Sequence, residues 1–559
     1  NQVSIKNSQI NSRGSFGRIF IGINNDDEIN KDLSNLSLPA TVDINDNSRL
    51  NTNAPDSNAE GGRISIFAAG QVNIAGSSNI SSQIRSENSE NNVQERDAND
   101  FSIIEIISRN GSLSLDNIDI STNNSNPGFA GDIIINAREE VSINQSNLRS
   151  RGNQGRILIG KSEVGSQTSS PRTVNIDNNS LLSTVNRDIE NADSQRINAG
   201  DISIDTDKLL VNNSSQIISS TVRNGNGGRI NITAADKFTL AQNSQIRSRV
   251  VDGDGKSGGI NIVAGSLEVT GKSEINTNIS SNVTSGGSDA IIDIDINARS
   301  IRLNDESLIT ANSEAGDGGN INLTPRDLLL LRRNSFISTT AQGGNGGNID
   351  IKAPNGFVVA VRRENSDIIA NAFAGKGGSV DIEVTSLFGI QPLSREDLVR
   401  LLGNNPGELD PRRLPTSDIT AISQENPNLS GQVNISALID PSRGLTELPI
   451  ALLDPSKQID NSCSIGTSRP SSQFVNSGRG GLPANPNDPL QTDATVSRLV
   501  TLPKNPPNQT PPPQNIQSEQ PIVEAQDAVR NGSRIKLVVN TSRGTSNGNW
   551  MSNQGCYVR

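Results

Sequence analysis

The chain has 559 residues, a formal net charge of -11 and no histidine. The negative charge argues against nucleic acid and anionic membrane surfaces as partners, and the lack of histidine removes the commonest general base, the commonest metal ligand and every Ser/His or Cys/His dyad. Hydrophobic residues make up 32% and aromatic residues 2%, which is too few for a large globular core and suits a thin column of aliphatic side chains.

Residues 1 to about 190 carry loose copies of a repeat made of short segments with apolar residues at every second position. The chain starts inside such a segment, at Val3-Ser4-Ile5, with neither an initiator Met nor a signal peptide. We therefore interpret the sequence as a fragment or a processed product. Two charged stretches, 87–100 and 188–195, interrupt the pattern and are expected to protrude from the fold.

From Gly200 to about Gln391 the repeat is regular. One phrase, Gly-x-Ile-x-Ile, returns every 28 to 31 residues or so, and in the clearest copies two further phrases follow it at fixed offsets. Alternating apolar residues indicate strands, and the gaps between them are too short for crossover helices. The copies of the first phrase begin at Gly228, Gly319, Gly347 and Gly378.

This periodicity predicts an all-β protein, a parallel β-helix spanning residues 1–440. Its resemblance to the pectin-lyase-like solenoids implies a right-handed coil, the usual hand in that class. About fourteen turns at 4.8 Å would give a column of roughly 65 to 70 Å. The Gly-rich joints, such as 225–228 and 343–347, are expected to supply corners with positive φ. The abundant Asn and Ser are expected at the bends, where the left-handed conformation is tolerated.

A loop insertion at 392–415 interrupts the repeats. Ser394-Arg395-Glu396-Asp397 has the form of a capping box, and Leu398 to Leu402 followed by Gly403 predicts a short surface helix. A last turn resumes at Ser417 and Gly431. Residues 439–453 are the candidate cap of the open end, within a cap and extended segment at 441–502.

The C-terminal tail is expected to be largely irregular. Residues 503–519 form a Pro-rich linker, and the segment 520–559 is expected to form one hairpin or to pair with another element. The two cysteines, Cys463 and Cys556, lie in this tail. They could form a disulfide in an exported protein or remain two unpaired thiols, and the absence of a CxxC motif argues against a zinc site.

The longest apolar runs, Leu328 to Leu331 and Val358 to Val361, fall far short of the roughly 18 residues that a membrane-spanning helix needs. No transmembrane segment is therefore expected.

Two outward carboxylates are the first candidate site. The residue between the two buried aliphatics of the phrase is Asp350 in one turn and Asp381 in the next. Stacking would place them about 4.8 Å apart, a spacing that suits a cation site or a retaining carboxylate pair. The alternative is a solvated outer face, because such chemistry also needs a basic partner and a cleft.

A second candidate is a basic stripe formed by Arg332, Arg333, Arg362 and Arg363 on adjacent turns. It could bind a sugar or an anionic ligand. The alternative is a solvated face offset by Glu364 and Asp327. The stretch Asp252-Gly253-Asp254-Gly255 resembles the start of a calcium loop but lacks the later ligands, so no metal and no cofactor is predicted.

Several longer phrases make the sequence similar to the cyanobacterial filamentous haemagglutinin-like exoproteins. The similarity covers roughly Gly200 to the C-terminus closely, and the first part only in the style of its repeats. The phrases are the stretches 328–335, 364–371, 387–391 and 440–449, the segment around Cys463, and the stretches 479–483 and 522–526.

This resemblance implies a non-enzymatic adhesin or structural exoprotein at the outer-membrane surface or in the extracellular space. Export would use two-partner secretion through an Omp85-type (TpsB) outer-membrane transporter, and the partners would be cell-surface glycans or other cells. The family's N-terminal secretion domain has no counterpart here. Asn426-Pro-Asn-Leu429 matches one of its short motifs, but it lies in a C-terminal loop. The alternatives are a polysaccharide-active β-helix enzyme and the stalk of a contact-dependent toxin.

Overall fold

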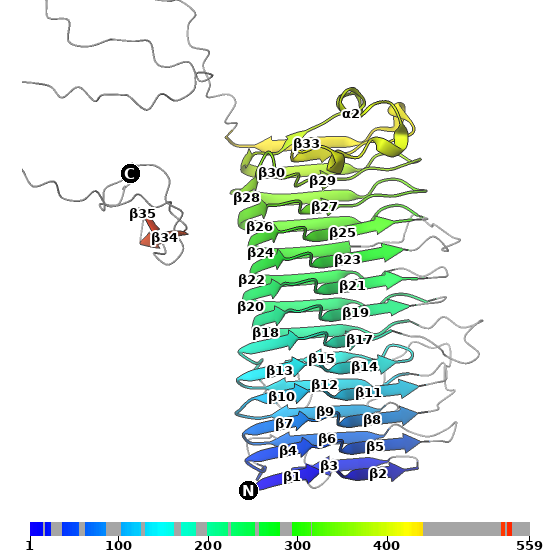
Figure 1. Cartoon of the computed structure of the whole chain (residues 1–559), viewed down its shortest axis with the longest axis vertical. Coiled ribbons are helices and arrows are strands. Elements are labelled where there is room, and N and C mark those ends of the chain that lie inside the picture. The colour runs from blue at the N-terminus through cyan, green and yellow to red at the C-terminus, as the bar shows by residue number, and fades with distance from the viewer. Residues whose placement is uncertain are drawn as a thin grey trace, which may run out of the picture. The chain divides into compact units, whose positions relative to one another are not determined.

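The computed structural model describes residues 1–14, 17–23, 36–54, 62–84, 102–124, 129–160, 169–185, 198–221, 225–251, 257–279, 293–314, 316–439, 527–531 and 534–538. The chain divides into two compact units, Asn1–Ile450 and Ala451–Arg559. The first unit contains the predicted repeats (Figure 1).

Each turn of the first unit is built from three strands. In the first turn, β1 (Gln2–Lys6), β2 (Gln9–Arg13) and β3 (Arg18–Ile21) pair in parallel with β4 (Thr41–Asn45), β5 (Arg49–Ala54) and β6 (Arg63–Ala68) of the second. We call the faces that begin with β1, β2 and β3 the first, second and third faces. The third turn contains β7 (Gln71–Ala75), β8 (Asn79–Ile84) and β9 (Ile103–Ser108), and the fourth contains β10 (Leu113–Asp116), β11 (Asp119–Asn124) and β12 (Asp132–Ala137). The fifth contains β13 (Glu140–Asn144), β14 (Asn147–Arg151) and β15 (Ile157–Ile159), and the sixth begins with β16 (Thr173–Asp177) and β17 (Leu181–Ser183).

Beyond Ile202 the third-face strand of one turn continues into the first-face strand of the next. These long strands are β18 (Ile202–Val211), β20 (Ile230–Leu240), β22 (Ile260–Thr270), β24 (Asp293–Asn304), β26 (Asn320–Leu331), β28 (Asn348–Ala360) and β30 (Ser379–Phe388). Register shifts mark the corner inside several of them, such as the shift between Leu323 and Leu328.

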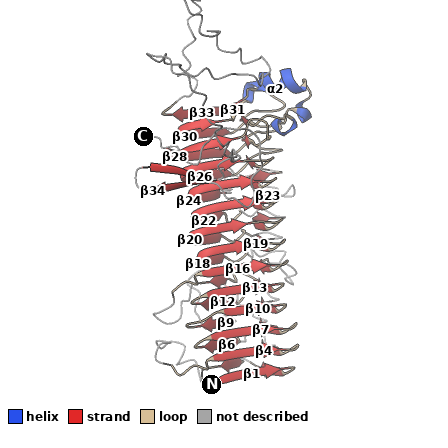
Figure 2. Cartoon of the chain, turned by 60° about the vertical axis from the view of Figure 1, so that its left-hand side comes forward, coloured by secondary structure: helices blue, strands red, loops and turns tan. Residues whose placement is uncertain are grey.

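The second face continues as a row of short strands. They are β19 (Gln216–Thr221), β21 (Gln245–Val250), β23 (Glu274–Ile279), β25 (Leu308–Ser313), β27 (Phe336–Ser338), β29 (Ile368–Ile369), β32 (Asp418–Thr420) and β31 (Gln391–Pro392), so this face has 14 strands. The last third-face strand, β33 (Gln432–Ala437), pairs with β30. The pairing within this unit is parallel and confirms the predicted parallel β-helix (Figure 2).

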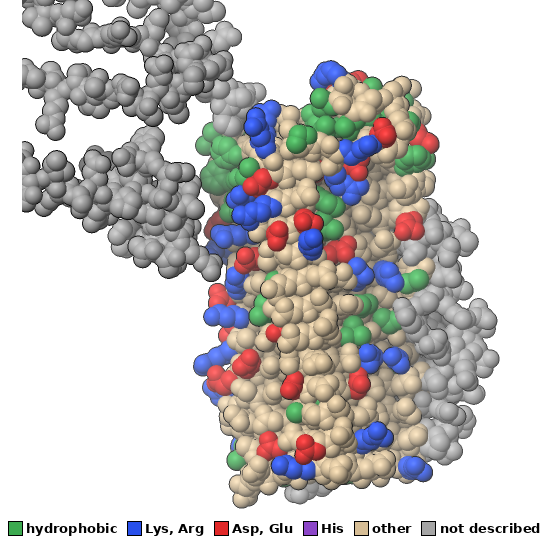
Figure 3. Space-filling model, viewed as in Figure 1, with side chains coloured by type: hydrophobic (Ala, Val, Ile, Leu, Met, Phe, Trp, Pro, Cys, Tyr) green, Lys and Arg blue, Asp and Glu red, His purple; other side chains and the backbone are tan. Residues whose placement is uncertain are grey.

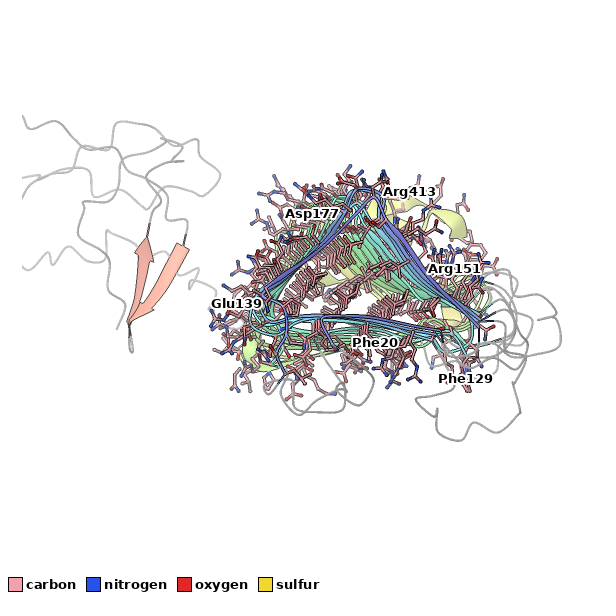
Figure 4. All side chains as sticks on the ribbon, turned by 90° about the horizontal axis from the view of Figure 1, so that it is seen from below. Phe20, Phe129, Glu139, Arg151, Asp177 and Arg413 are labelled. Carbon is pink, nitrogen blue, oxygen red and sulfur yellow. The ribbon has the colours of Figure 1, made fainter. Side chains whose placement is uncertain are left out.

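The helix is right-handed. Figure 4 looks along the axis from the N-terminal end, and there the chain passes from Glu139, before β13, through the corner near Asp177 to Arg151 at the end of β14, which is a clockwise path. Because the chain recedes from the viewer as it turns clockwise, the coil has the right-handed sense.

A column of aliphatic side chains fills the interior. In the regular turns, Ile230, Ile260, Ile294, Ile321 and Ile349 lie in register on consecutive rungs and are at most 1% exposed. The neighbouring residues of each strand point outward, as the two-residue period of a strand requires. One continuous cluster of buried side chains runs from Ile19 to Ala421.

The corner between the first and second faces is a tight turn followed by a buried serine. Two consecutive residues adopt φ values between 48° and 65°, as in the pairs Asn178/Asn179, Asn213/Ser214, Gln242/Asn243, Gly271/Lys272, Asp305/Glu306 and Arg333/Asn334. The next residue is a serine that is at most 1% exposed. These serines form a ladder: Ser48, Ser78, Ser146, Ser180, Ser215, Ser244, Ser273, Ser307, Ser335, Ser366 and Ser417.

The glycines at the corner between the second and third faces have a different role from the one predicted. Gly228 and Gly347 do not have positive φ. They are glycines because consecutive turns approach each other too closely for a side chain: a Cβ on Gly347 would lie 1.8 Å from the carbonyl oxygen of Gly319. Hydroxyl groups of the second face bond to these backbones, as Ser248 does to the carbonyl oxygen of Gly228 at 3.0 Å.

Long connections enter at this same corner. Ile84 is followed by β9 only at Ile103, and Ile279 is followed by β24 only at Asp293. Connections between the first and second faces take only a few residues, as from Asn45 to Arg49. The predicted protruding stretches 87–100 and 188–195 lie outside the described residues.

The insertion after β31 packs on the C-terminal end of the column (Figure 2). Helix α2 (Arg395–Leu402) begins with the predicted capping box between Ser394 and Asp397 and ends at Gly403. The turns η3 (Pro406–Glu408), η4 (Pro411–Arg413) and η5 (Pro427–Leu429) follow. Leu398, Leu409, Leu414 and Ile422 form a separate buried cluster that attaches the insertion to the column.

The second unit contains one described element, an antiparallel hairpin of β34 (Asp527–Asn531) and β35 (Arg534–Val538). Except for Ile439, the predicted cap at 439–453 lies outside the described residues, as do the Pro-rich linker 503–519, Cys463, Cys556 and the stretch 252–255. Among the described residues, no helix is long and apolar enough to cross a bilayer.

Candidate functional site

The structure places Asp350 and Asp381 on adjacent rungs of the third face. They are paired in register between β28 and β30 and point outward, because Ile349, Ile351 and their partners occupy the interior. The same column also contains Asp295, which was not predicted because its repeat lacks the initial glycine. In order along the axis the column reads Asn231, Asn261, Asp295, Asn322, Asp350, Asp381 and Asn434.

A lysine accompanies the carboxylate pair. The Lys352 ammonium bonds to the Asp350 carboxylate, and the side-chain amide of Asn434 donates to Asp381 at 2.7 Å. The bond to Asp350 raises the pKa of Lys352, and the charges of Asp350, Glu383 and Asp381 add to this effect. The charge of Asp350 is therefore neutralised by Lys352, and Asp381 accepts a hydrogen bond from the amide of Asn434.

Within the outward columns, amide hydrogen bonds join neighbouring rungs. Asn322 donates to Asp295 at 2.7 Å, and a second chain runs from Ser379 to Asn348, from Asn348 to Asn320 and from Asn320 to Asp293, each at 3.0 Å. Burial raises the pKa of Asp293, while the hydrogen bond from Asn320 opposes this change. Much of the polar third face thus stabilises the stacking of turns. In the described part of the chain, no group of three or more acidic or cysteine side chains is placed to hold a metal.

A polar groove interrupts this face. In the column that contains Arg229 and Asp293, the intervening rung carries Gly259, which has φ +80 and no side chain. The resulting groove has a volume of about 710 Å³ and is lined by Arg229, Asp293, Asp295, Asn231 and Asn261, with Asp201 at its edge. Mixed charges and amides that surround an open groove are suited to a ligand rich in hydroxyl groups.

The predicted basic stripe is not a row of free cations. Arg332 bonds to both carboxylate oxygens of Glu364 at 2.6 and 2.9 Å, and the backbone N–H of Arg333 donates to Glu364 at 2.9 Å. The bond to Arg332 lowers the pKa of Glu364 and raises that of Arg332. Arg362 and Arg363 are exposed, and Asp327 lies 3.8 Å from Arg299. Glu364 therefore offsets part of the charge of the stripe, whereas the ion pair of Asp327 is with Arg299.

An apolar strip on the first face was not predicted. Leu328 and Leu330 of β26, Phe357 and Val359 of β28 and Phe388 of β30 all point outward on consecutive rungs. The rings of Phe357 and Phe388 lie 6.2 Å apart and are 40% and 42% exposed. Hydrophobic side chains gather at the upper left of Figure 3, over β28 and β30. The run of four leucines from Leu328 was the available signal, because a strand must direct two of them outward.

Comparison with known proteins gives no family assignment. No protein-family model matches the chain, and no curated protein or solved structure is similar to it.

Proposed function

We propose that this protein is a secreted or surface-exposed exoprotein of the filamentous haemagglutinin-like kind, a rigid adhesin exported by two-partner secretion through an Omp85-type transporter. The observation that carries the proposal is the uninterrupted column. Its second face has 14 stacked strands, which corresponds to a rod of about 65 Å at 4.8 Å for each rung. A rod of this kind presents surface at a distance from its point of attachment.

The polar groove around Gly259 is the part of the rod that we propose contacts cell-surface glycans. It offers a guanidinium, carboxylates and amides within one opening, and these groups can bond to the hydroxyls of a sugar.

The export proposal is tested by expressing the complete reading frame with and without the neighbouring Omp85-type transporter. Antibody labelling of intact cells should detect the β-helix at the surface only when the transporter is present. Labelling that requires permeabilised cells in both strains would contradict the proposed secretion route.

The adhesion proposal is tested by binding of the purified protein to a glycan array. We expect Arg229→Ala to weaken glycan binding at least about tenfold, because a charged hydrogen bond contributes roughly 1.5 to 3 kcal/mol. Arg302→Ala is the matched control, since Arg302 is also exposed but lies outside the groove. Equal binding by both variants would exclude the groove as the glycan site.

A second candidate, a polysaccharide-active enzyme, is favoured by one observation. Lys352 supplies the basic partner that the Asp350/Asp381 pair needs for such chemistry. The pair lies on an open face, with Asp350 35% exposed. Cleavage of acidic and neutral polysaccharides by the wild type, lost in the Asp350→Asn/Asp381→Asn double variant, would establish this candidate in place of the adhesin.

A further inference from the structure

Two buried aspartates lie side by side at the C-terminal end of the column. Ile368 of β29 and Ile419 of β32 are in register and point inward, so the preceding residues, Asp367 and Asp418, occupy adjacent rungs on the outward side of the second face. Both aspartates are nevertheless 0% exposed. The insertion covers them.

Two of the four carboxylate oxygens of this acid pair accept no hydrogen bond from the described residues. The backbone N–H of Asp418 donates to Asp367 Oδ1 at 2.8 Å, and the Thr416 hydroxyl donates to Asp418 Oδ2 at 2.7 Å. Asp367 Oδ2 and Asp418 Oδ1 are buried and find no hydrogen-bond partner among the described residues. An unpaired buried carboxylate oxygen is costly when it is charged and much less so when the acid is protonated.

The charges that face the pair come from the insertion and from the loop after β28. Asp410 and Arg412 of η4 bond to each other at 2.7 Å, and the Arg412 guanidinium lies over the ring of Phe336, 5.2 Å from its centroid. Phe336 is the residue in register with Asp367 on the preceding rung. The charge of Arg362 acts on Asp418 and lowers its pKa, although burial raises that pKa overall.

These surroundings favour a neutral acid. Burial raises the pKa of Asp367 to about 7, and the charges of Asp418 and Asp410 contribute to the increase, while the Asp418 N–H and Arg412 oppose it. An aspartate in an open, solvated position has a pKa near 3.9. Asp367 therefore binds a proton more tightly when the insertion is closed than when it is open.

The other contacts of the insertion are apolar packing and hydrogen bonds to backbone carbonyls. Leu398, Leu409 and Leu414 pack against Ile422, and Arg395 donates to the carbonyl oxygens of Ser423 and Gln424 at 3.2 and 3.0 Å. These contacts hold the insertion in place while the acid pair sets how tightly it closes.

We propose that residues 393–416, the insertion as the structure bounds it between β31 and β32, form a pH-sensitive clasp over the Asp367/Asp418 pair. The clasp is closed firmly when the pair carries a proton and loosened when both carboxylates ionise. The sign follows from proton binding: the closed state binds the additional proton, so closure is strongest below about pH 4 and weakens as the pH rises toward about 7. Above that pH the weakening is complete. Loosening would expose the last rungs of the column.

The test is hydrogen exchange on the full chain between pH 5 and pH 8. The N–H of Leu393 donates to the carbonyl of Ile419, and the N–H of Asp418 donates to Asp367, so both amides report on closure. We expect their protection factors, corrected for intrinsic exchange, to fall by on the order of tens-fold across this range. The amide of Ile349, in the middle of the column, should remain constant.

Variants separate the clasp from general effects of pH. Asp367→Asn imitates the protonated acid and should flatten the pH profile, whereas Asp305→Asn, at an exposed carboxylate, should leave it unchanged. Asp418→Asn removes the neighbouring charge and should move the transition to lower pH, which keeps the test informative if Asp367→Asn folds poorly. A wild-type profile without pH dependence, or one equal to that of Asp367→Asn, would overturn the proposal.

Discussion

In most turns, a buried serine replaces a strand hydrogen bond at a place where the backbone bends, although Ile118 holds this position in one turn. The N–H of Ser244 donates to the hydroxyl oxygen of Ser273 on the next rung at 3.2 Å, and the Ser273 hydroxyl donates to the carbonyl of Thr270 at 2.7 Å. Since the left-handed residues before the serine interrupt the regular ladder, the hydroxyl satisfies a backbone donor that would otherwise be buried without a partner.

Removing one hydroxyl should therefore be costly. We expect Ser273→Ala to lower the free energy of unfolding by about 1 to 3 kcal/mol, the usual cost of leaving a buried donor unsatisfied. Urea unfolding followed by circular dichroism measures the change. Ser203→Ala, at an outward position of β18, is the control and should change stability by less than about 0.5 kcal/mol. Equal losses of stability in the two variants would show that the serine ladder makes no special contribution to stability.

Glycines at the other corner are required by contact between turns. We expect Gly347→Ala to destabilise the column by more than about 2 kcal/mol, because its Cβ would lie 1.8 Å from a carbonyl oxygen and the neighbouring turns would have to separate. Gly316→Ala is a matched control, since its Cβ would meet nothing closer than 3.6 Å. Thermal unfolding of the two variants should differ clearly, and a tolerated Gly347→Ala would show that the turns can move apart.

At the scale of elements, the insertion is attached to the column by an apolar cluster of its own, separate from the main core. Leu409→Ala should loosen it, because a buried leucine truncated to alanine costs about 2 to 5 kcal/mol. Tryptic cleavage after Arg400 should accelerate while the dichroism of the column stays unchanged. Leu401→Ala provides the comparison on the same insertion, as Leu401 is 54% exposed. Cleavage of Leu409→Ala at the wild-type rate would show that this apolar cluster does not hold the insertion on the column.

The sequence predicts those elements whose signals repeat. Asp350 and Asp381 could be placed on adjacent rungs because both sit between two aliphatics at the same offset from a glycine. Asp367 and Asp418 could not, because the insertion separates them by 51 residues and hides the register between β29 and β32. Likewise, the apolar strip depends on which side of β26, β28 and β30 each residue faces, and a register error of one residue would have reversed the assignment.

At the scale of the whole molecule, the column should behave as a stack of interchangeable turns. Deleting residues 319–346, one complete repeat from glycine to glycine, should leave a folded β-helix with slightly lower stability and an unchanged dichroism per residue. Deleting only 319–332 removes part of a turn and should abolish the cooperative transition in urea. Unfolding of both deletion variants would show that particular turns, rather than the repeat, determine the fold.

The corners between the three faces differ in how long a connection they carry, and this difference has a consequence for the evolution of the protein. Connections between the first and second faces are short and carry the buried serine. Those between the second and third faces and between the third and first faces vary in length, as shown by the intervals from Ile84 to Ile103 and from Ile21 to Thr41. At the connections of variable length, insertions and deletions in the gene change only the outer surface, so selection acts on them only through that surface. We therefore expect closely related copies of the gene to differ most in length at these connections. The outer surface of the rod would then vary between strains while the aliphatic core stays the same.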